Sequence, residues 1–281
     1  MVIRTIFLMA QDCARGERMG WQEFVRDYAG IARGLLAHYF PDIDRGRDAA
    51  CCVSTTTPNF DEHVVAVFRR AGSNGSAWFA GLSFSNEREF MMAFRDLVFA
   101  YGREQDCIPP SEVTLDRVQA VMKDLNLLER ELLWLFIKGY DAAQIAAIMM
   151  NAAATTEAVQ RIADERLAAL VAEAAPGALS RSARALMAAA EQSRSQQCPS
   201  LKTFNDLVNG QITWRDREVA EEHINNCFYC IDRFTTFQEM VRLRKEVPQL
   251  PPAEVEAILA QFPLAAKRRR VLSRLLARRA I

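Results

Sequence analysis

The stretch that decides the fold class spans residues 21–39 and reads WQEFVRDYAGIARGLLAHY. Its apolar residues recur at steps of three and four, which places them on one face of a helix. They are Trp21, Phe24, Val25, Tyr28, Ile31, Ala32, Leu35, Leu36 and Tyr39. Pro41 predicts the end of this helix, because proline cannot continue one. The same spacing returns over residues 90–101. We therefore expect an all-α protein.

Composition agrees with this fold class and limits the functions. Glycine (12) and proline (10) are scarce among 281 residues, which favours helices. The formal net charge is zero, so any nucleic acid must be held by local patches. No run approaches the roughly 20 apolar residues that cross a bilayer. The short apolar start lacks a basic lead, so we expect no signal peptide and a cytoplasmic protein. In that compartment metal binding explains clustered cysteines better than disulfides do.

Breaks in the helical pattern predict a multi-domain helical protein. Pro109 and Pro110 mark a first linker, and Pro176-Gly177 with the polar stretch 191–197 marks a second. The glycine- and serine-containing segment 71–76 predicts a loop. The expected divisions are a helical domain at 1–106, a linker at 107–111, a four-helix domain at 112–175, a linker at 176–197, a small helical domain at 198–246, and a C-terminal helix with a basic tail at 247–281.

Four residues suited to metal binding fall in the small domain: Cys198, His223, Cys227 and Cys230. His223 and Cys227 are four residues apart and would share one face of a helix. Cys227 and Cys230 form a Cys-x-x-Cys step. Three thiolates and one imidazole make a closed tetrahedron, which suits one structural Zn²⁺ per chain. The alternatives are buried free thiols with a surface histidine, or a redox Cys-x-x-Cys, although no strand–helix unit accompanies it.

A helical hairpin would bring Cys198 to the other three ligands. Its turn is expected at Asn209-Gly210, since Gly210 suits a left-handed helix end. Thr213 and Asp216 would then cap the returning helix.

The sequence from Cys198 to Cys230 resembles the zinc-binding anti-sigma domain. That family has a cysteine, a helix ending near glycine, and then His-x-x-x-Cys-x-x-Cys, and all four ligand positions are matched here. The resemblance covers about residues 196–245. It implies a small helical bundle that binds a sigma factor or the cognate part of its own chain.

Residues 125–149 contain a helix, an exit at Gly139 and a second helix, which is typical of a helix-turn-helix lead-in. Asp141 with Gln144 predicts a capping box for the second helix. The segment resembles region four of an extracytoplasmic-function sigma factor, which implies contacts with promoter DNA and polymerase. The candidate DNA-binding residues on the following helix are Thr155, Thr156, Gln160, Arg161 and Arg166.

Two features of this segment leave a second interpretation open. The turn at 150–154 is about three residues longer than the family's. Glu157, Asp164 and Glu165 share the recognition helix, and carboxylates oppose the phosphate contacts that dominate DNA affinity. The alternative is a helical bundle used for protein contacts.

Residues 20–105 resemble region two of the same sigma family. Residues 60–69 resemble its polymerase-binding helix, with Val65 and Ala66 where the family usually has Gln and Glu. The implied polymerase-binding residues are Asp61, Glu62, Val64, Phe68 and Arg69. The segment 90–103 lies where the family melts the promoter, and the 72–75 loop lies where it captures a flipped base. Arg95, Tyr101 and Arg103 are the candidates for stacking on unpaired bases. The alternative is that Phe90, Phe94 and Phe99 are core residues.

The C-terminal tail contains Lys267-Arg268-Arg269-Arg270 and three further arginines. It could lie on a membrane surface, nucleic acid or an acidic partner, or be a solvated helix. Glycine-rich phosphate loops and hydrolase motifs are absent from the sequence, so we expect no enzyme and no small-molecule substrate.

The sequence thus predicts a sigma-type regulator of transcription initiation. It would bind core RNA polymerase, with promoter DNA as a further partner, and its zinc-binding domain would modulate it in cis. The alternative is a scaffold or anti-sigma interaction protein that holds another transcription regulator and does not bind DNA.

Overall fold

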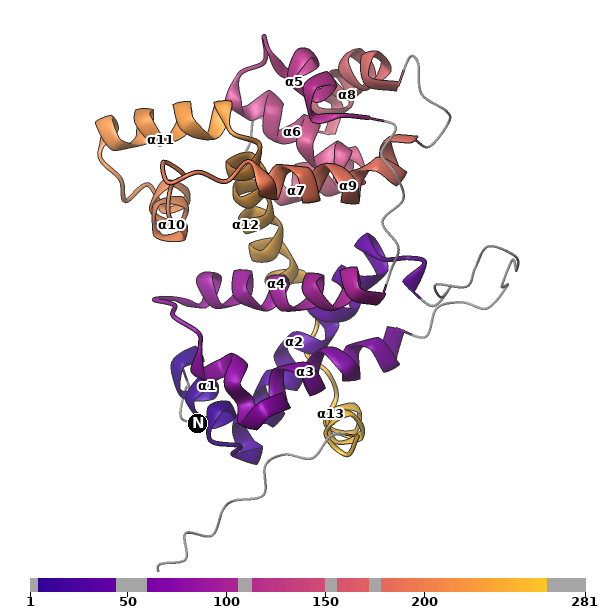
Figure 1. Cartoon of the computed structure of the whole chain (residues 1–281), viewed down its shortest axis with the longest axis vertical. Helices are drawn as coiled ribbons and strands as arrows, with labels where there is room; N and C mark the ends of the chain where they lie inside the picture. Colours follow the sequence, from indigo (N-terminus) through magenta and orange to yellow (C-terminus); the bar gives the residue numbers. More distant parts are fainter. Residues whose placement is uncertain (1–4, 44–59, 106–112, 150–155, 172–177, 262–281) are drawn as a thin grey trace, which may run out of the picture. The chain divides into compact units, whose positions relative to one another are not determined.

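The computed structural model describes residues 5–43, 60–105, 113–149, 156–171 and 178–261. Over these ranges the regular structure consists of thirteen α helices and contains no strand (Figure 1). The predicted all-α class is confirmed. The chain divides into two compact units. The first unit combines Met1–Gln105 with Val247–Ile281, and the second unit is Asp106–Glu246.

The first unit is built around one long helix. Its helices are α1 (Ile6–Ala14), α2 (Arg18–Tyr39), α3 (Phe60–Ala80), α4 (Glu87–Gln105) and α13 (Pro252–Leu259). The central helix α2 packs against each of the other four. It ends before Pro41, as predicted. Its apolar face, from Trp21 to Tyr39, is buried, so the three-and-four spacing marks the side that meets its neighbours.

Aromatic rings form the core of this unit. The ring of Phe24 on α2 lies 4.8 Å from that of Phe68 on α3 and 5.4 Å from that of Phe94 on α4. Both pairs are edge-to-face, the arrangement that the ring quadrupole favours. Phe90, Phe94 and Phe99 are buried, which confirms the alternative that they are core residues.

Helix α3 runs through the segment 71–76 that the sequence predicts as a loop, so this prediction was wrong. Ala71 at the start of this segment and Phe79 beyond its end are buried, and their packing outweighs the low helix propensity of the residues between them. The predicted irregularity survives at one residue, Ser76, whose φ of 64° lies in the left-handed region. The helix is therefore distorted there but does not end.

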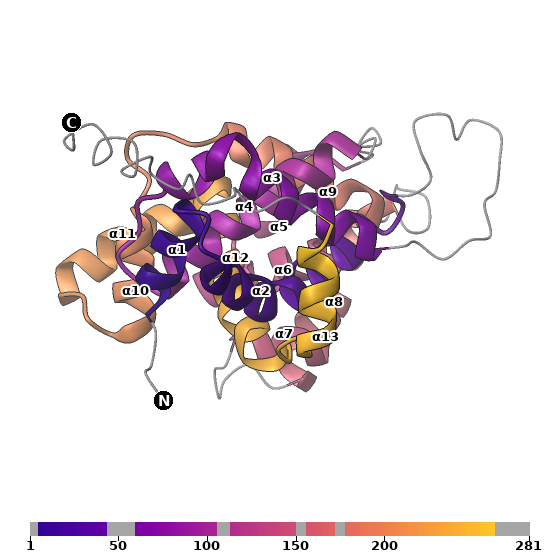
Figure 2. The same ribbon diagram turned by 90° about the horizontal axis from the view of Figure 1, so that it is seen from below.

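The segment after Glu246 returns to the first unit, although the sequence suggests a separate C-terminal element. The backbone amide of Leu250 donates to the carbonyl of Arg26 over 2.9 Å. Gln22 donates to Glu256 of α13 over 2.7 Å. A Cβ at Gly30 would lie only 2.5 Å from Val247, so this close approach requires glycine. Helix α13 thereby lies beside α2 (Figure 2).

The second unit contains eight helices. They are α5 (Leu115–Met122), α6 (Leu127–Ile137), α7 (Ala142–Met149), α8 (Thr156–Val171), α9 (Ala178–Gln192), α10 (Leu201–Asn209), α11 (Trp214–Asn226) and α12 (Phe228–Glu246). The segments 112–175 and 198–246, predicted as separate domains, both lie in this unit. The predicted linker 176–197 is largely helix α9. Within the unit, α10 and α11 project to one side of the α5–α9 bundle (Figure 1).

Local capping in this unit follows the sequence. The carboxylate of Asp141 accepts from the amide of Gln144 over 2.8 Å, and the side chain of Gln144 accepts from the amide of Asp141 over 3.0 Å. This confirms the predicted capping box at the start of α7. None of the helices in the described ranges combines the length and apolarity needed to cross a membrane.

Candidate metal centre

A hairpin of α10 and α11 returns the chain to Cys198. Ser200 caps the start of α10, and Gly210 ends it with a φ of 67°. Thr213 then caps α11 by accepting a hydrogen bond from the amide of Asp216 over 3.3 Å. The predicted turn and cap are both confirmed. The hairpin places the end of α11 next to Cys198, which lies shortly before α10.

The four predicted ligands meet at this point. The ligand atoms of Cys198, His223, Cys227 and Cys230 all lie within 4.8 Å of one another. The sulfurs of Cys198 and Cys227 are 3.9 Å apart. Two thiolates on one tetrahedral Zn²⁺, each bound at about 2.3 Å, lie about 3.8 Å apart. A disulfide would bring them to about 2 Å. The cluster could therefore hold a metal ion and is compatible with one zinc.

The ligands come from helix ends and not from one helix face. Helix α11 ends at Asn226, and Cys227 follows with a φ of −130° and a ψ of 115°. The four-residue spacing suggested that His223 and Cys227 share one face of a helix. In the structure they do not, because the helix ends between them. The extended backbone at Cys227 turns the chain into α12, whose first turn carries the buried Cys230. A break in the helix is what lets His223, Cys227 and Cys230 converge.

The electrostatics of the cluster also fit a cation. The Nε2 atom of His223 is buried and has no hydrogen-bond partner within the described residues. Burial raises the pKa of the Cys198 thiol, but hydrogen bonds with Ser195, His223 and Cys230 together outweigh it and lower that pKa to about 6. Burial and the neighbouring thiols Cys198 and Cys227 raise the pKa of Cys230. A divalent cation would take up the free imidazole nitrogen and offset the repulsion between thiolates.

Residues before Cys198 support the cluster in a way that the sequence did not reveal. The amide of Ser195 donates to the sulfur of Cys198 over 3.2 Å. The hydroxyl of Ser193 accepts from the amide of Tyr229 over 3.0 Å, which ties this segment to the start of α12. Composition indicated only a polar linker here.

Neither a protein-family model, a curated protein nor a solved structure matches the chain.

A buried polar network joins α12 to the C-terminal end of α6. The ammonium of Lys138 lies 2.9 Å from the carboxylate of Glu239 and 3.0 Å from the hydroxyl of Thr236. The hydroxyl of Tyr140 donates to Glu239 as well. The side chains of Lys138 and Glu239 are only 0% and 1% exposed. Sequence reasoning missed this pair, because residues 98 or more positions apart give no local signal.

Two further contacts extend the same interface. The indole nitrogen of Trp134 donates to the carboxylate of Asp232 over 3.0 Å. The guanidinium of Arg130 donates to the carbonyl of Asn225 over 2.6 Å. Asn225 lies between His223 and Cys227 in the chain, so Arg130 connects α6 directly to the backbone of the metal cluster.

The predicted DNA-binding residues of α8 lie on an exposed surface of mixed charge. Thr156, Gln160 and Arg161 are exposed, Arg166 is half-buried, and Thr155 lies outside the described residues. The amide of Gln160 donates to the carboxylate of Asp164 over 2.7 Å. Glu157, Asp164 and Glu165 are exposed on the same helix. The structure thus places the basic and acidic side chains together.

The predicted polymerase-binding residues separate into two groups. Val64 and Phe68 are fully buried in the first unit, so they are not exposed for a surface contact, and here the prediction was wrong. The ring of Phe68 packs against Phe24 of α2 and Phe94 of α4. Asp61, Glu62 and Arg69 are exposed. The carboxylate of Asp61 accepts from the guanidinium of Arg33 over 2.6 Å.

The predicted base-stacking residues of α4 are largely engaged within the first unit. Arg95 is 4% exposed, and its guanidinium lies 3.6 Å from the centre of the Phe99 ring, so it is not a surface residue as predicted. The hydroxyl of Tyr101 is 2.7 Å from Nδ1 of His63. Arg103 is half-buried in the last turn of α4. The basic tail at 262–281 lies outside the described residues.

Proposed function

We propose that this protein is a sigma-type regulator of transcription initiation whose own zinc-held segment, residues 198–246, acts in cis. The zinc would be bound by Cys198, His223, Cys227 and Cys230. Four protein ligands leave no position for water or substrate, so the ion would be structural and not catalytic. Its role would be to hold α10, α11 and the start of α12 together.

The observation that carries the cis arrangement is the buried network between α6 and α12. A charged pair taken out of water is tolerated only when its partners are in place, and removing one partner leaves an uncompensated charge. Lys138, which directly follows α6, and Glu239 on α12 form such a pair. The face of α12 that carries Glu239 is therefore already occupied by the helix-turn-helix-like bundle of the same chain. This supports regulation within the chain over capture of a separate protein by that face.

We propose that metal binding at the cluster controls whether α12 stays packed against the α5–α8 helices. Zinc fixes the junction of α11 and α12, and Arg130 of α6 holds the carbonyl of Asn225 at that junction. Loss of the ion would loosen the junction of α11 and α12 and, with it, the contact between Arg130 and Asn225. The α5–α8 helices, which resemble the polymerase- and promoter-binding region, would then be released from α12.

Binding to core RNA polymerase tests this proposal. Zinc-loaded full-length protein would bind core polymerase at least ten times more weakly than the Cys198→Ser variant, which lacks one ligand. Cys13→Ser in the first unit is the matched control, because Cys13 is a buried cysteine outside the cluster, and it would bind like the wild type. Equal affinities of wild type and Cys198→Ser would remove the inhibitory role.

A second candidate function rests on the surface of α8. Three exposed carboxylates accompany Gln160 and Arg161 on that helix, and they oppose contacts with phosphate. This favours a scaffold or anti-sigma protein that does not bind DNA. Fluorescence anisotropy with promoter duplexes separates the two. Sequence-dependent binding that weakens steeply with salt supports the sigma-type function, whereas absence of binding at low salt supports the scaffold.

A further inference from the structure

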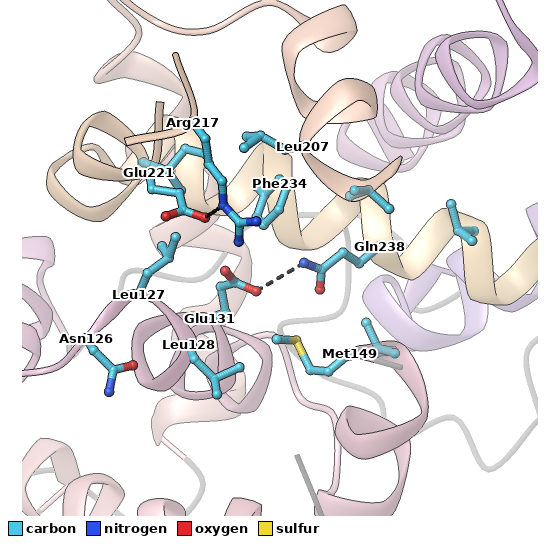
Figure 3. A pocket seen from close by; sticks show the side chains of 14 residues that line it. Asn126, Leu127, Leu128, Glu131, Met149, Leu207, Arg217, Glu221, Phe234 and Gln238 are labelled. Carbon is cyan, nitrogen blue, oxygen red and sulfur yellow. Dashed lines mark hydrogen bonds and ion pairs between the residues drawn. The ribbon is translucent and has the colours of Figure 1, made fainter. Parts of the chain in front are cut away.

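A cavity of about 490 Å³, open to solvent, lies in the second unit among α6, α7, α10, α11 and α12 (Figure 3). This volume is within the range of roughly 300–1,000 Å³ that small-molecule sites occupy. Most of its wall is apolar. The apolar lining includes Leu127, Leu128, Met149, Leu207, Ile224 and Phe234. Both the helix-turn-helix-like helices and the metal-binding segment contribute to it.

Five polar side chains interrupt the apolar wall: Asn126, Glu131, Arg217, Glu221 and Gln238. Two of them, Glu131 and Gln238, are joined by a hydrogen bond. Glu131 of α6 is 5% exposed, and its Oε2 accepts from Nε2 of Gln238 on α12 over 3.0 Å. The other amide atom, Oε1 of Gln238, is buried and has no hydrogen-bond partner within the described residues. Figure 3 shows both side chains pointing into the cavity. A buried oxygen without a donor costs free energy, so a donor supplied by a ligand would be favourable.

The electrostatics of the cavity favour a positive ligand. Burial, with a smaller contribution from the neighbouring Glu221, raises the pKa of Glu131 to about 8, and a cation beside the carboxyl group would stabilise its charged form. The guanidinium of Arg217 lines the same cavity but is paired with Glu221 over 2.7 Å. A ligand carboxylate would meet the carboxyl groups of Glu131 and Glu221. An ammonium group would instead offer three donors and a positive charge to Glu131 and Gln238.

We propose that this cavity binds a small amphipathic primary amine. Its ammonium group would donate to the carboxylate of Glu131 and to Oε1 of Gln238. Its hydrocarbon part would lie against Leu128, Met149 and Leu207. The inference does not depend on the sigma-type function, since it rests on the cavity alone. It adds a ligand where the sequence predicted no small-molecule partner.

Three probes of equal chain length test the proposal on the zinc-loaded full-length protein. Hexylamine, 1-hexanol and hexanoate differ only in the head group, and isothermal titration calorimetry measures each. Hexylamine is expected to bind saturably, one per chain, and at least ten times more tightly than either of the others. Absence of saturable binding by hexylamine, or equal or tighter binding of hexanoate, overturns the proposal.

Variants assign the binding to this cavity. Glu131→Gln keeps the shape and one acceptor oxygen but removes the negative charge. It is expected to weaken hexylamine at least tenfold while 1-hexanol is unchanged. Leu128→Trp fills the cavity and is expected to weaken both. Asp116→Asn, which removes an exposed carboxylate from α5, is the control and leaves both unchanged. Circular dichroism and zinc content confirm that each variant is folded. Unaltered hexylamine binding by folded Glu131→Gln contradicts the assignment, whatever the behaviour of Leu128→Trp.

Discussion

The two units are stabilised by different chemistry at the positions where their helices meet. In the first unit, Phe24 packs edge-to-face on Phe68 and Phe94, and no charge is involved in these contacts. In the second unit, α12 meets α6 through Lys138 and Glu239, a pair with almost no exposure to solvent. Aromatic packing tolerates gradual loss of contact area. A buried ion pair depends on both partners and on the position of the helix that carries each.

The difference is clearest at the α10–α11 hairpin, which carries the candidate metal cluster. The α10–α11 hairpin has two fully buried large apolar residues, Phe204 in α10 and Ile224 in α11, while Val208, Trp214 and Val219 are exposed. Such a hairpin has little core of its own. The cluster of Cys198, His223, Cys227 and Cys230 can supply what the packing lacks. In the first unit, buried aromatic rings provide the corresponding stabilisation.

Metal removal is expected to have the largest effect. Structural zinc contributes on the order of 10 kcal/mol to the folding of small units. A chelator, or Cys230→Ser, should therefore unfold α10 and α11 and shift the urea transition of the second unit. The first unit should keep its transition, and Cys13→Ser should retain the full zinc content. Circular dichroism with metal analysis measures both. Simultaneous loss of both transitions would contradict the claim that the metal stabilises the second unit alone.

Removing one partner of the buried pair should come next. Lys138→Met leaves Glu239 charged and buried, and it should cost about 3–5 kcal/mol in urea unfolding. The double variant Lys138→Met/Glu239→Gln removes that charge and still offers an acceptor to Tyr140. We expect it to recover about 2 kcal/mol of the loss. If the double variant is less stable than the single one, the pair is not the source of the cost.

A truncation in the aromatic core sharpens the contrast. Phe68→Ala creates a cavity between α2 and α4 and should cost about 3 kcal/mol. Zinc content should not change. The effects of Phe68→Ala and of the chelator should add, because the two perturbations act in different units. A strong departure from additivity in the urea transitions would show that the units are coupled.

The smallest expected effect is a pH dependence that belongs to the second unit. Burial raises the pKa of Glu131 from 4.5 to about 8, so the folded state holds a proton that the unfolded state releases. The stabilising contribution of the protonated group is full below pH 4.5 and is lost as the pH rises through about 8. Between pH 6 and 8 the wild type should lose about 2 kcal/mol relative to Glu131→Gln. Parallel urea titrations at both pH values measure this. A constant difference between the two proteins would contradict it.

Features with a local cause were predicted well from the sequence. The spacing of apolar residues predicted α2, and Pro41 predicted its end. The cap at Thr213 and the left-handed Gly210 follow from the chemistry of single residues. The four metal ligands were found because their types are rare and their spacing is distinctive. Each of these signals lies within a few residues of the feature that it produces.

Features that depend on distant partners were not predicted. Nothing near Lys138 indicates that Glu239 will neutralise it, and nothing near Glu256 indicates that α13 will pack on α2. Phe68 was assigned to a polymerase contact and Arg95 to base stacking from their position in a resemblance, and burial places both in the core. The cavity around Glu131 is formed by five helices, so it exists only once the chain has folded.

X-ray absorption spectroscopy at the zinc edge, on stoichiometrically metallated full-length protein, tests the central claim most directly. A closed structural site of three cysteines and one histidine predicts one zinc per chain, with three sulfur atoms at about 2.3 Å and one nitrogen at about 2.0–2.1 Å. It also predicts that His223→Ala removes the nitrogen without adding a fourth sulfur. A spectrum dominated by oxygen ligands, or one that is unchanged in His223→Ala, would contradict the account.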